Sequence, residues 1–152
     1  MKSDNLFRHL WIPFGIAVLV YIIFYGGIEH RRTRQGPWEV LFTNDASGAP
    51  ALVITETNLG IANLRISFPG ETNRASNEVL SFSQPREVPY NIPFGQCVFM
   101  DTTFLPGTIV FDLFGHEIQL IPRVLTIDKK EMAWESGKMI TVSGTNGLKS
   151  LR

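Results

Sequence analysis

The histidines are the side chains of this chain with the widest chemical capacity, because imidazole binds metals and haem and transfers protons near neutral pH. The sequence has three of them. His116 stands beside Glu117 and four residues after Asp112, so these three side chains are a candidate metal-binding group. The alternative is a histidine in a hairpin turn, next to acidic side chains that face water. The sequence around His116 favours this alternative, because a glycine precedes it between two apolar runs.

The other two histidines bracket an apolar stretch. His9 precedes residues 10–28 and His30 follows them, so a helix would hold the two imidazoles far apart. Either one is a candidate axial ligand for a pigment or a haem in a larger complex, and the alternative is an ordinary polar residue at a membrane surface. We expect the second, and the sequence predicts no bound cofactor.

The possible nucleophiles do not lie in any sequence motif that is typical of a catalytic site. Cys97 is the single cysteine, which excludes an internal disulfide and a cysteine metal cluster, and its apolar neighbours predict a small core residue. Asp101, Thr102 and Thr103 follow that apolar run. The chain has no GxSxG, Walker or GxGxxG motif. We therefore expect a protein that is not an enzyme.

Residues 10–28 are nineteen residues without a charged side chain, and as a membrane anchor they would hold the rest of the chain at a bilayer. As a helix this stretch is about 28 Å long, close to the hydrocarbon core of a bilayer at about 30 Å. The sequence predicts one transmembrane helix at 10–28, after a short N-terminal tail at 1–9. A cleaved signal peptide is the main alternative, but its apolar core is usually shorter and ends in a small-x-small cleavage site.

Several residues of this stretch suit a membrane anchor. Trp11 lies near one end and Tyr21 and Tyr25 lie toward the other, as expected for aromatic side chains at the two headgroup levels. Pro13 marks the first turns of the apolar run, and Gly15 leaves a shallow surface that a neighbouring helix can approach. These five residues are the predicted anchor positions.

Residues 29–36 form a basic juxtamembrane joint. Arg31, Arg32 and Arg34 are predicted to contact lipid headgroups, each contact being worth about 1 kcal/mol on an anionic surface. The distribution of basic residues about the span leans slightly toward a cytoplasmic domain. The lysine-poor domain and the short N-terminal tail instead favour export. We expect a single-pass protein of the bacterial cytoplasmic (inner) membrane whose domain is extracytoplasmic.

The pattern changes to short β-strands over residues 37–142, followed by a tail at 143–152. Leu64, Ile66 and Phe68 alternate with polar residues that include Ser67, which predicts a strand with one buried face. The sequence predicts an all-β domain, an antiparallel sandwich or barrel of about nine or ten strands. The predicted strands are 38–43, 52–55, 61–68, 79–82, 98–100, 108–114, 117–121, 124–127, 132–134 and 138–142.

A proline-rich segment interrupts these strands. Prolines recur every four residues and forbid a helix, so the segment is predicted to be an extended edge or surface loop. It is either a crossover between sheets or a loop that docks a partner. The candidate partner residues are Pro85, Pro89, Tyr90, Pro93 and Phe94.

The charge balance limits the function. The chain has 14 basic and 14 acidic side chains and no visible basic face, so no nucleic-acid partner is expected. The expected partners are the lipid bilayer and other subunits of a membrane complex, in which this chain would be a structural or accessory subunit of an energy-transducing or other assembly. The alternative is a tethered envelope module or chaperone that binds a peptide or ligand through its β-domain.

The organisation is similar to that of the H subunit of purple bacterial reaction centres. The likeness consists of one N-terminal span, an aromatic and then basic exit from Tyr25 to Pro37, and a β-rich domain. It covers the architecture only, without an alignable motif in the domain. It implies a cytoplasmic position for the domain, in contrast to the position that composition favours.

Overall fold

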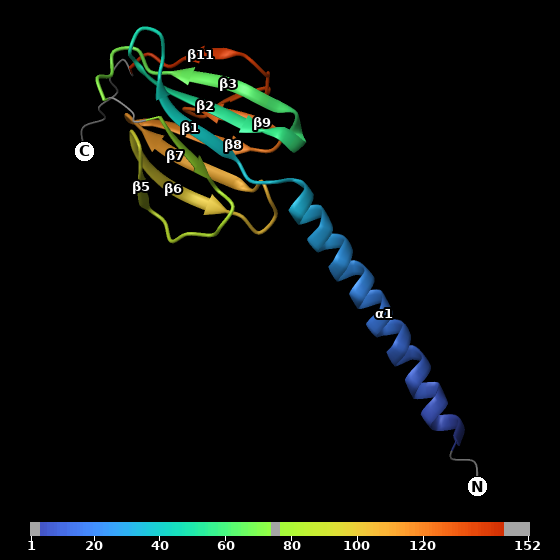
Figure 1. The fold of residues 1–152 in the computed structure, drawn as a ribbon. Helices are drawn as coiled ribbons and strands as arrows, with labels where there is room; N and C mark the ends of the chain where they lie inside the picture. Colours follow the sequence, from blue (N-terminus) through green and yellow to red (C-terminus); the bar gives the residue numbers. More distant parts are fainter. Residues whose placement is uncertain (1–3, 74–76, 145–152) are drawn as a thin grey trace. The chain divides into compact units, whose positions relative to one another are not determined.

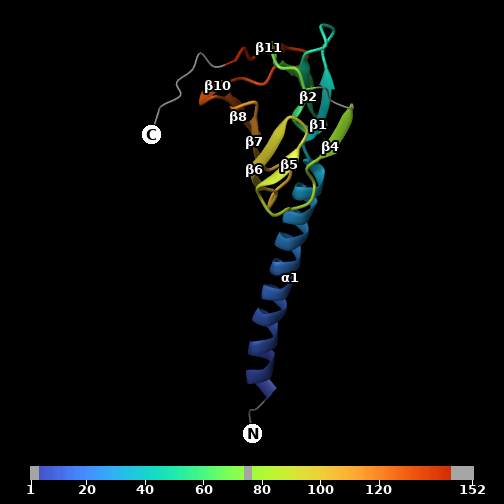
Figure 2. The same cartoon turned by 90° about the vertical axis from the view of Figure 1, so that its left-hand side faces the viewer.

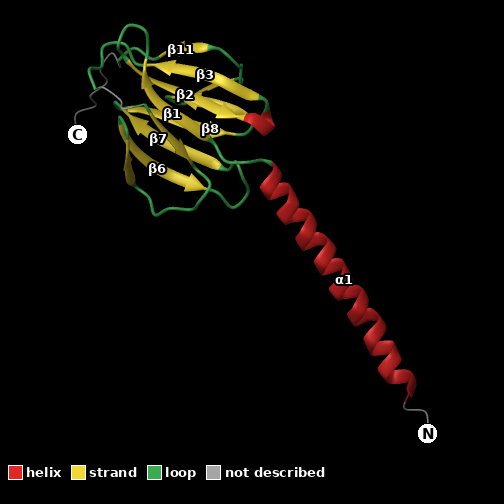
Figure 3. Ribbon diagram, in the orientation of Figure 1, coloured by secondary structure: helices red, strands yellow, loops and turns green. Residues whose placement is uncertain are grey.

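A computed structural model describes residues 4–73 and 77–144 of the chain. It divides into two compact units, Met1–Arg34 and Gln35–Arg152, which we describe separately. In the described residues, the first unit is one helix, and the second consists of two β-sheets with a single short 3-10 turn, η1 (Thr57–Leu59) (Figures 1 and 3). The predicted mostly β fold with one N-terminal apolar helix is confirmed.

The helix α1 runs from Asp4 to Arg34 and is longer than the predicted span at both ends. Its segment Phe7–Arg32 is long and apolar enough to cross a membrane, with a mean hydropathy of 2.0, and none of it is buried. Most of the predicted joint is helical because arginine is a good helix former and positive charge in the last turn complements the helix dipole. Residues 29–34 thus continue the helix.

Over residues 35–73 and 77–144, eleven strands form two separate sheets, so the structure has a sandwich arrangement and not a closed barrel. The first sheet has the order β11-β3-β2-β1-β4 and the second β10-β9-β8-β7-β6-β5. The pairs are antiparallel except for β11 and β3. The first sheet contains β1 (Glu39–Asn44), β2 (Pro50–Glu56), β3 (Ile61–Ser67), β4 (Glu78–Ser81) and β11 (Met139–Thr141). The second contains β5 (Tyr90–Ile92), β6 (Gly95–Asp101), β7 (Thr108–Leu113), β8 (His116–Ile121), β9 (Val124–Ile127) and β10 (Lys130–Met132).

Figures 1 and 2 show how the strands of the two sheets are arranged. The two sheets share one apolar core, to which alternate residues of most strands contribute. Aromatic rings join the sheets across this core: the Phe42 ring on β1 lies 6.4 Å from that of Phe111 on β7. Leu64, Ile66 and Phe68 are buried as predicted. Ser67, predicted on the polar face, is also buried because its hydroxyl donates a hydrogen bond of 2.6 Å to Asp45.

Trp38, at the start of the β-domain, makes hydrogen bonds and a ring contact with segments of both sheets. Its carbonyl accepts a hydrogen bond from the Phe82 amide at the end of β4. Its fully buried indole donates from Nε1 to the Gly107 carbonyl, 2.9 Å away, in the loop before β7. Its ring lies 5.1 Å from that of Trp134. Three distant segments of the chain therefore converge on one residue that lies four positions after the last residue of α1.

Candidate functional site

The structure corrects the predicted position of His116. The hairpin loop between β7 and β8 is Phe114-Gly115, with φ angles of 54° and 80°, as in a type I′ turn. His116 is therefore the first residue of β8, and it is 3% exposed. Its Nδ1 lies 2.6 Å from an Asp128 carboxylate oxygen. The imidazole has a structural partner in place of the solvent that a turn would give it.

The predicted metal group around His116 does not form. Asp112 and Glu117 face each other across β7 and β8, but their side chains lie on the opposite face of the sheet from the buried His116. Within residues 4–73 and 77–144, no group of three or more histidine, cysteine or acidic side chains is placed to hold a metal ion. The prediction from sequence proximity is wrong because the side chains of neighbouring strand residues point to opposite faces of the sheet.

Cys97 is fully buried in β6, which confirms the prediction of a small core residue. Burial raises the pKa of its thiol, because the thiolate would lose its hydration there. The sulfur lies 3.5 Å from the carbonyl oxygen of Phe99. The thiol thus belongs to the packing between the sheets.

The predicted anchor residues all lie on α1 and are exposed. Trp11 packs edge-on against Phe14 at 5.9 Å between ring centroids, and the rings of Tyr21 and Tyr25 stack at 6.0 Å. Pro13 lies inside the helix, and no atom approaches the space that a side chain at Gly15 would fill. The helix includes the three arginines of the predicted headgroup contact in its last turn, Arg31, Arg32 and Arg34. Lipid contact by these residues stays a prediction.

The same helix includes His9 and His30. Twenty-one positions of helix part them, which corresponds to about 30 Å along the axis. Both are exposed on the isolated helix. Among the described residues, no hydrogen bond or ion pair of either imidazole is present. Ligation of a pigment or haem stays untested.

The proline-rich segment is part strand and part loop. Tyr90–Ile92 forms the edge strand β5, which agrees with the predicted extended edge although this strand was not among the predicted strands. Phe94 is a correction to the predicted partner surface: it is only 8% exposed and its ring packs 5.8 Å from that of Phe42. Pro85 and Pro89 are exposed, whereas Tyr90 and Pro93 are half-buried. The accessible part of the segment is therefore its beginning.

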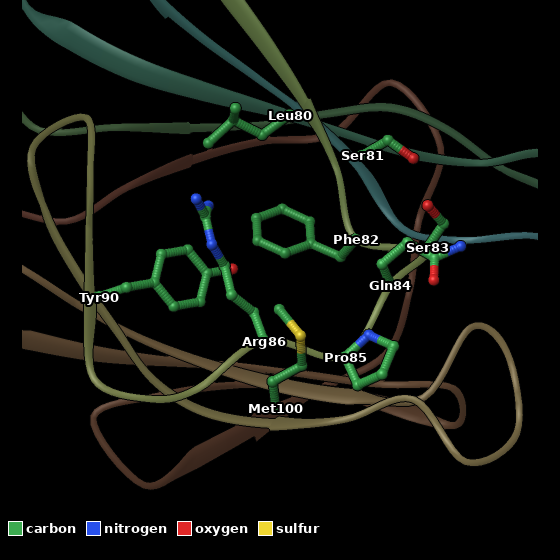
Figure 4. Close-up of a pocket in the computed structure, with 9 residues that line it drawn as sticks. All are labelled: Leu80, Ser81, Phe82, Ser83, Gln84, Pro85, Arg86, Tyr90 and Met100. Carbon is green, nitrogen blue, oxygen red and sulfur yellow. The ribbon is translucent and has the colours of Figure 1, made fainter.

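A pocket of about 270 Å³ lies at that beginning, between the edge strand of each sheet (Figure 4). Its walls come from β4, from the loop that follows β4, and from β5 and β6. Figure 4 shows Phe82, Arg86 and Tyr90 converging on the centre of the pocket. The residues that line it are Leu80, Ser81, Phe82, Ser83, Gln84, Pro85, Arg86, Tyr90 and Met100.

Arg86 is the one charged side chain in this lining. Its guanidinium carbon lies 4.6 Å from the centre of the Tyr90 ring, a cation–π contact. Burial first, and then the nearby Cys97, raise the pKa of Tyr90, whereas Arg86 acts in the opposite direction. In the part of the chain that the structure describes, no carboxylate lies within 4.0 Å of the Arg86 guanidinium. The pocket thus presents a positive charge, two serine hydroxyls and an amide beside apolar walls.

Sequence reasoning identified Tyr90 and Pro85 in this pocket but missed the rest of its lining. Seven of the lining residues are the continuous run 80–86, and the packing of the sheets adds Tyr90 and Met100 to it. No spacing in the sequence signals such a site. The one available hint is an arginine inside a proline-rich segment, a position where the backbone cannot be helical.

Comparison of the chain with protein-family models, with curated proteins and with solved structures finds no match. The fold defines a mostly β protein with a single N-terminal apolar helix. Its function has to be argued from the geometry of this chain.

Proposed function

We propose that this chain is a single-pass, membrane-anchored β-domain that acts as a non-catalytic structural or accessory subunit of a larger membrane complex. One observation carries the proposal: α1 has none of its apolar span Phe7–Arg32 buried, while the β-domain completes its own core from residues 38–142. The apolar surface of the helix has no partner in its own unit, so lipid and the helices of other subunits cover it.

Membrane insertion follows from the composition of the span. Each leucine, isoleucine, valine or phenylalanine near the centre of a membrane helix favours insertion by about 0.3 to 0.6 kcal/mol. The span holds many of these residues and no charge between Leu10 and Ile28. The arginines of the last turn then lie at headgroup level, where each contributes about 1 kcal/mol on an anionic surface. We infer an uncleaved anchor in the bacterial cytoplasmic membrane.

Assembly is supported by exposed apolar groups outside the helix. Val98 and Phe99, at a bulge in β6, are 38% and 48% exposed, and Phe104 in the next loop is 60% exposed. Exposed apolar side chains such as these are available for contact with a partner. Other subunits of a membrane complex are therefore the proposed partners, with the β-domain on the extracytoplasmic side.

A tethered binding module is the second candidate function, favoured by the pocket around Arg86 and by the open sheet edge beside it. In a binding module the helix serves only to hold the domain at the membrane. In a subunit the helix also packs on its neighbours, because association of helices in lipid depends on close contact between particular faces. The two functions therefore differ in what they require of α1.

The test replaces residues 10–28 by an unrelated apolar span of equal length and measures recovery of co-purifying subunits at matched expression. A subunit role predicts normal membrane insertion and reduced recovery. The control changes Arg31, Arg32 and Arg34 to glutamine, which removes only headgroup contacts and should reduce recovery less. Full recovery with the generic span would favour the binding module.

The side of the membrane is tested separately. Protease added to intact spheroplasts should digest the β-domain if it is extracytoplasmic. Protection until the membrane is broken would place the domain in the cytoplasm and overturn that part of the proposal.

A further inference from the structure

The four edges of the two sheets differ in how well they are protected against pairing with another strand. Natural edges are usually blocked by proline, by charged side chains or by shortness. Pro89 and Pro93 flank the edge strand β5, and β10 begins with Lys130 and Glu131. The edge strand β11 has three residues. These three edges are protected.

The fourth edge, β4, has four residues and is the least protected of the four in the described part of the chain. It contains no proline or lysine, its single charged residue is Glu78 at its first position, and its Val79 side chain is 60% exposed. The strand is held in place at its start, where the Thr43 hydroxyl on β1 lies 2.5 Å from the Asn77 side-chain oxygen. At its end the Phe82 amide donates to the Trp38 carbonyl at 3.0 Å. Among the described residues, this edge is therefore held in place and has no strand paired to its outer side.

The backbone groups that β4 offers can be assigned. Because the Phe82 amide points to β1, the amide of Leu80, two residues earlier, points the same way. The amide and carbonyl groups of Val79 and Ser81 then point away from β1. Within the described residues, β4 has no strand on that outer side. Two residues thus present donors and acceptors in the arrangement that an added strand needs.

The pocket adds a charge next to this edge. Leu80 and Ser81 of β4 form part of its wall, and Arg86 is its single charged lining residue. The guanidinium rests on the Tyr90 ring, which orients it while its donors stay free of any described carboxylate within 4.0 Å. A carboxylate is the group that a guanidinium fork pairs with best.

We propose that the β4 edge and the Arg86 pocket together bind an extended segment of a partner polypeptide, which adds as a strand to β4 and places a carboxylate on Arg86. The backbone of Val79 and Ser81 supplies sequence-independent hydrogen bonds, and Arg86 supplies the preference for an acidic side chain. This inference rests on the proposed function in that the partner is another polypeptide of the complex.

The experiment uses the full chain in detergent micelles and a fluorescent, end-blocked octapeptide of alternating threonine and valine with one central glutamate. The same peptide with glutamine is the comparison, and binding is measured by anisotropy. We expect the glutamate peptide to bind about tenfold more tightly, as for a hydrogen bond to a charged group. In Arg86→Gln the two peptides should bind equally.

The edge is tested by Val79→Pro, which removes one outward amide without touching a bond to β1, since proline is tolerated on an edge strand. Binding of both peptides should fall about tenfold or more. Val79→Thr keeps the amide and the β-branched shape, so it should bind as the unchanged chain does. Far-UV circular dichroism of each variant checks the fold, and Arg86→Gln tests the proposal independently if Val79→Pro does not fold.

The outcomes separate this inference from the proposed function. The chain with a generic span at 10–28 should bind the peptides normally, whatever happens to its recovery with other subunits. Equal affinity for the glutamate and glutamine peptides, undiminished binding by folded Val79→Pro, or no binding of either peptide would each overturn the inference.

Discussion

His116 and Asp128 are joined by a 2.6 Å contact between Nδ1 and a carboxylate oxygen, although twelve residues separate them in the chain. A carboxylate only accepts, so Nδ1 donates. The other carboxylate oxygen accepts from the Glu117 amide at 3.0 Å, and the Asp128 amide donates to the Glu117 carbonyl at 2.9 Å. The turn after β9 is thus tied to the first residues of β8.

Asp128→Ala should lower the free energy of unfolding by about 2 kcal/mol, because a buried imidazole donor would lose its partner. Asp128→Asn should have a smaller effect, since its amide oxygen still accepts and asparagine tolerates the φ of 49° at this position. Thermal unfolding of the full chain in detergent measures both. The matched control is Asp112→Ala, an exposed carboxylate on β7. A control effect as large as that of Asp128→Ala would contradict the assigned role.

Gly107 and Gly48 both have positive φ angles, 76° and 85°, but differ in their surroundings. A side chain at Gly107 would overlap the Asp101 carbonyl, whereas nothing lies within 4 Å at Gly48. Gly48→Ala should cost about 1 kcal/mol for the left-handed backbone alone. Gly107→Ala should cost about 1 to 3 kcal/mol more, because the loop that receives the Trp38 hydrogen bond must move. Equal losses in thermal unfolding would show that this loop is not tightly packed.

The Asp45 carboxylate should contribute to the loss of folding stability at acidic pH. Hydrogen bonds from the Ser47 and Ser67 hydroxyls, followed by those of nearby backbone amides, lower its pKa from 3.8 to about 2. The native carboxylate therefore stays ionised where the unfolded chain binds a proton, so its stabilisation is complete above about pH 4 and disappears as the pH falls toward 2.

Asp45→Asn should lower the melting temperature at pH 5 and flatten its decline between pH 4 and 2. The hydroxyl and amide of Thr103 also lower the pKa of Asp101. The melting temperature of Asp45→Asn should therefore still decline somewhat as the pH falls. Melting temperatures of both chains across this range provide the measurement. Parallel curves would mean that Asp45 is not the group that titrates.

The anchor makes a biochemical prediction. Carbonate washing removes proteins held by charge and leaves inserted helices in the membrane, so the β-domain should stay in the pellet with α1 still attached. N-terminal sequencing of the pelleted chain checks that the helix is present. Recovery of a form that begins near Glu29 would show that the helix is a cleaved signal sequence.

The sequence by itself determined the elements whose causes are local. An apolar run from Leu10 to Ile28 has few options besides a helix, and β9 at Val124–Ile127 begins and ends at the residues predicted from the short β-forming run after Pro122. Alternation also assigned the buried face of β3, because a side chain's face depends only on its position within the strand. These predictions required no knowledge of what packs against what.

Tertiary structure alone decided the rest. His116 is buried because the turn after β9 provides Asp128 as its partner, and Phe94 enters the core because the opposite sheet provides Phe42. The parallel pairing of β11 with β3 depends on contacts between segments far apart in the chain, and the pocket around Arg86 depends on the packing of residues 80–86 against β5 and β6. Such contacts are selected by the summed burial of the whole domain, and a local pattern of residues contains no information on that sum.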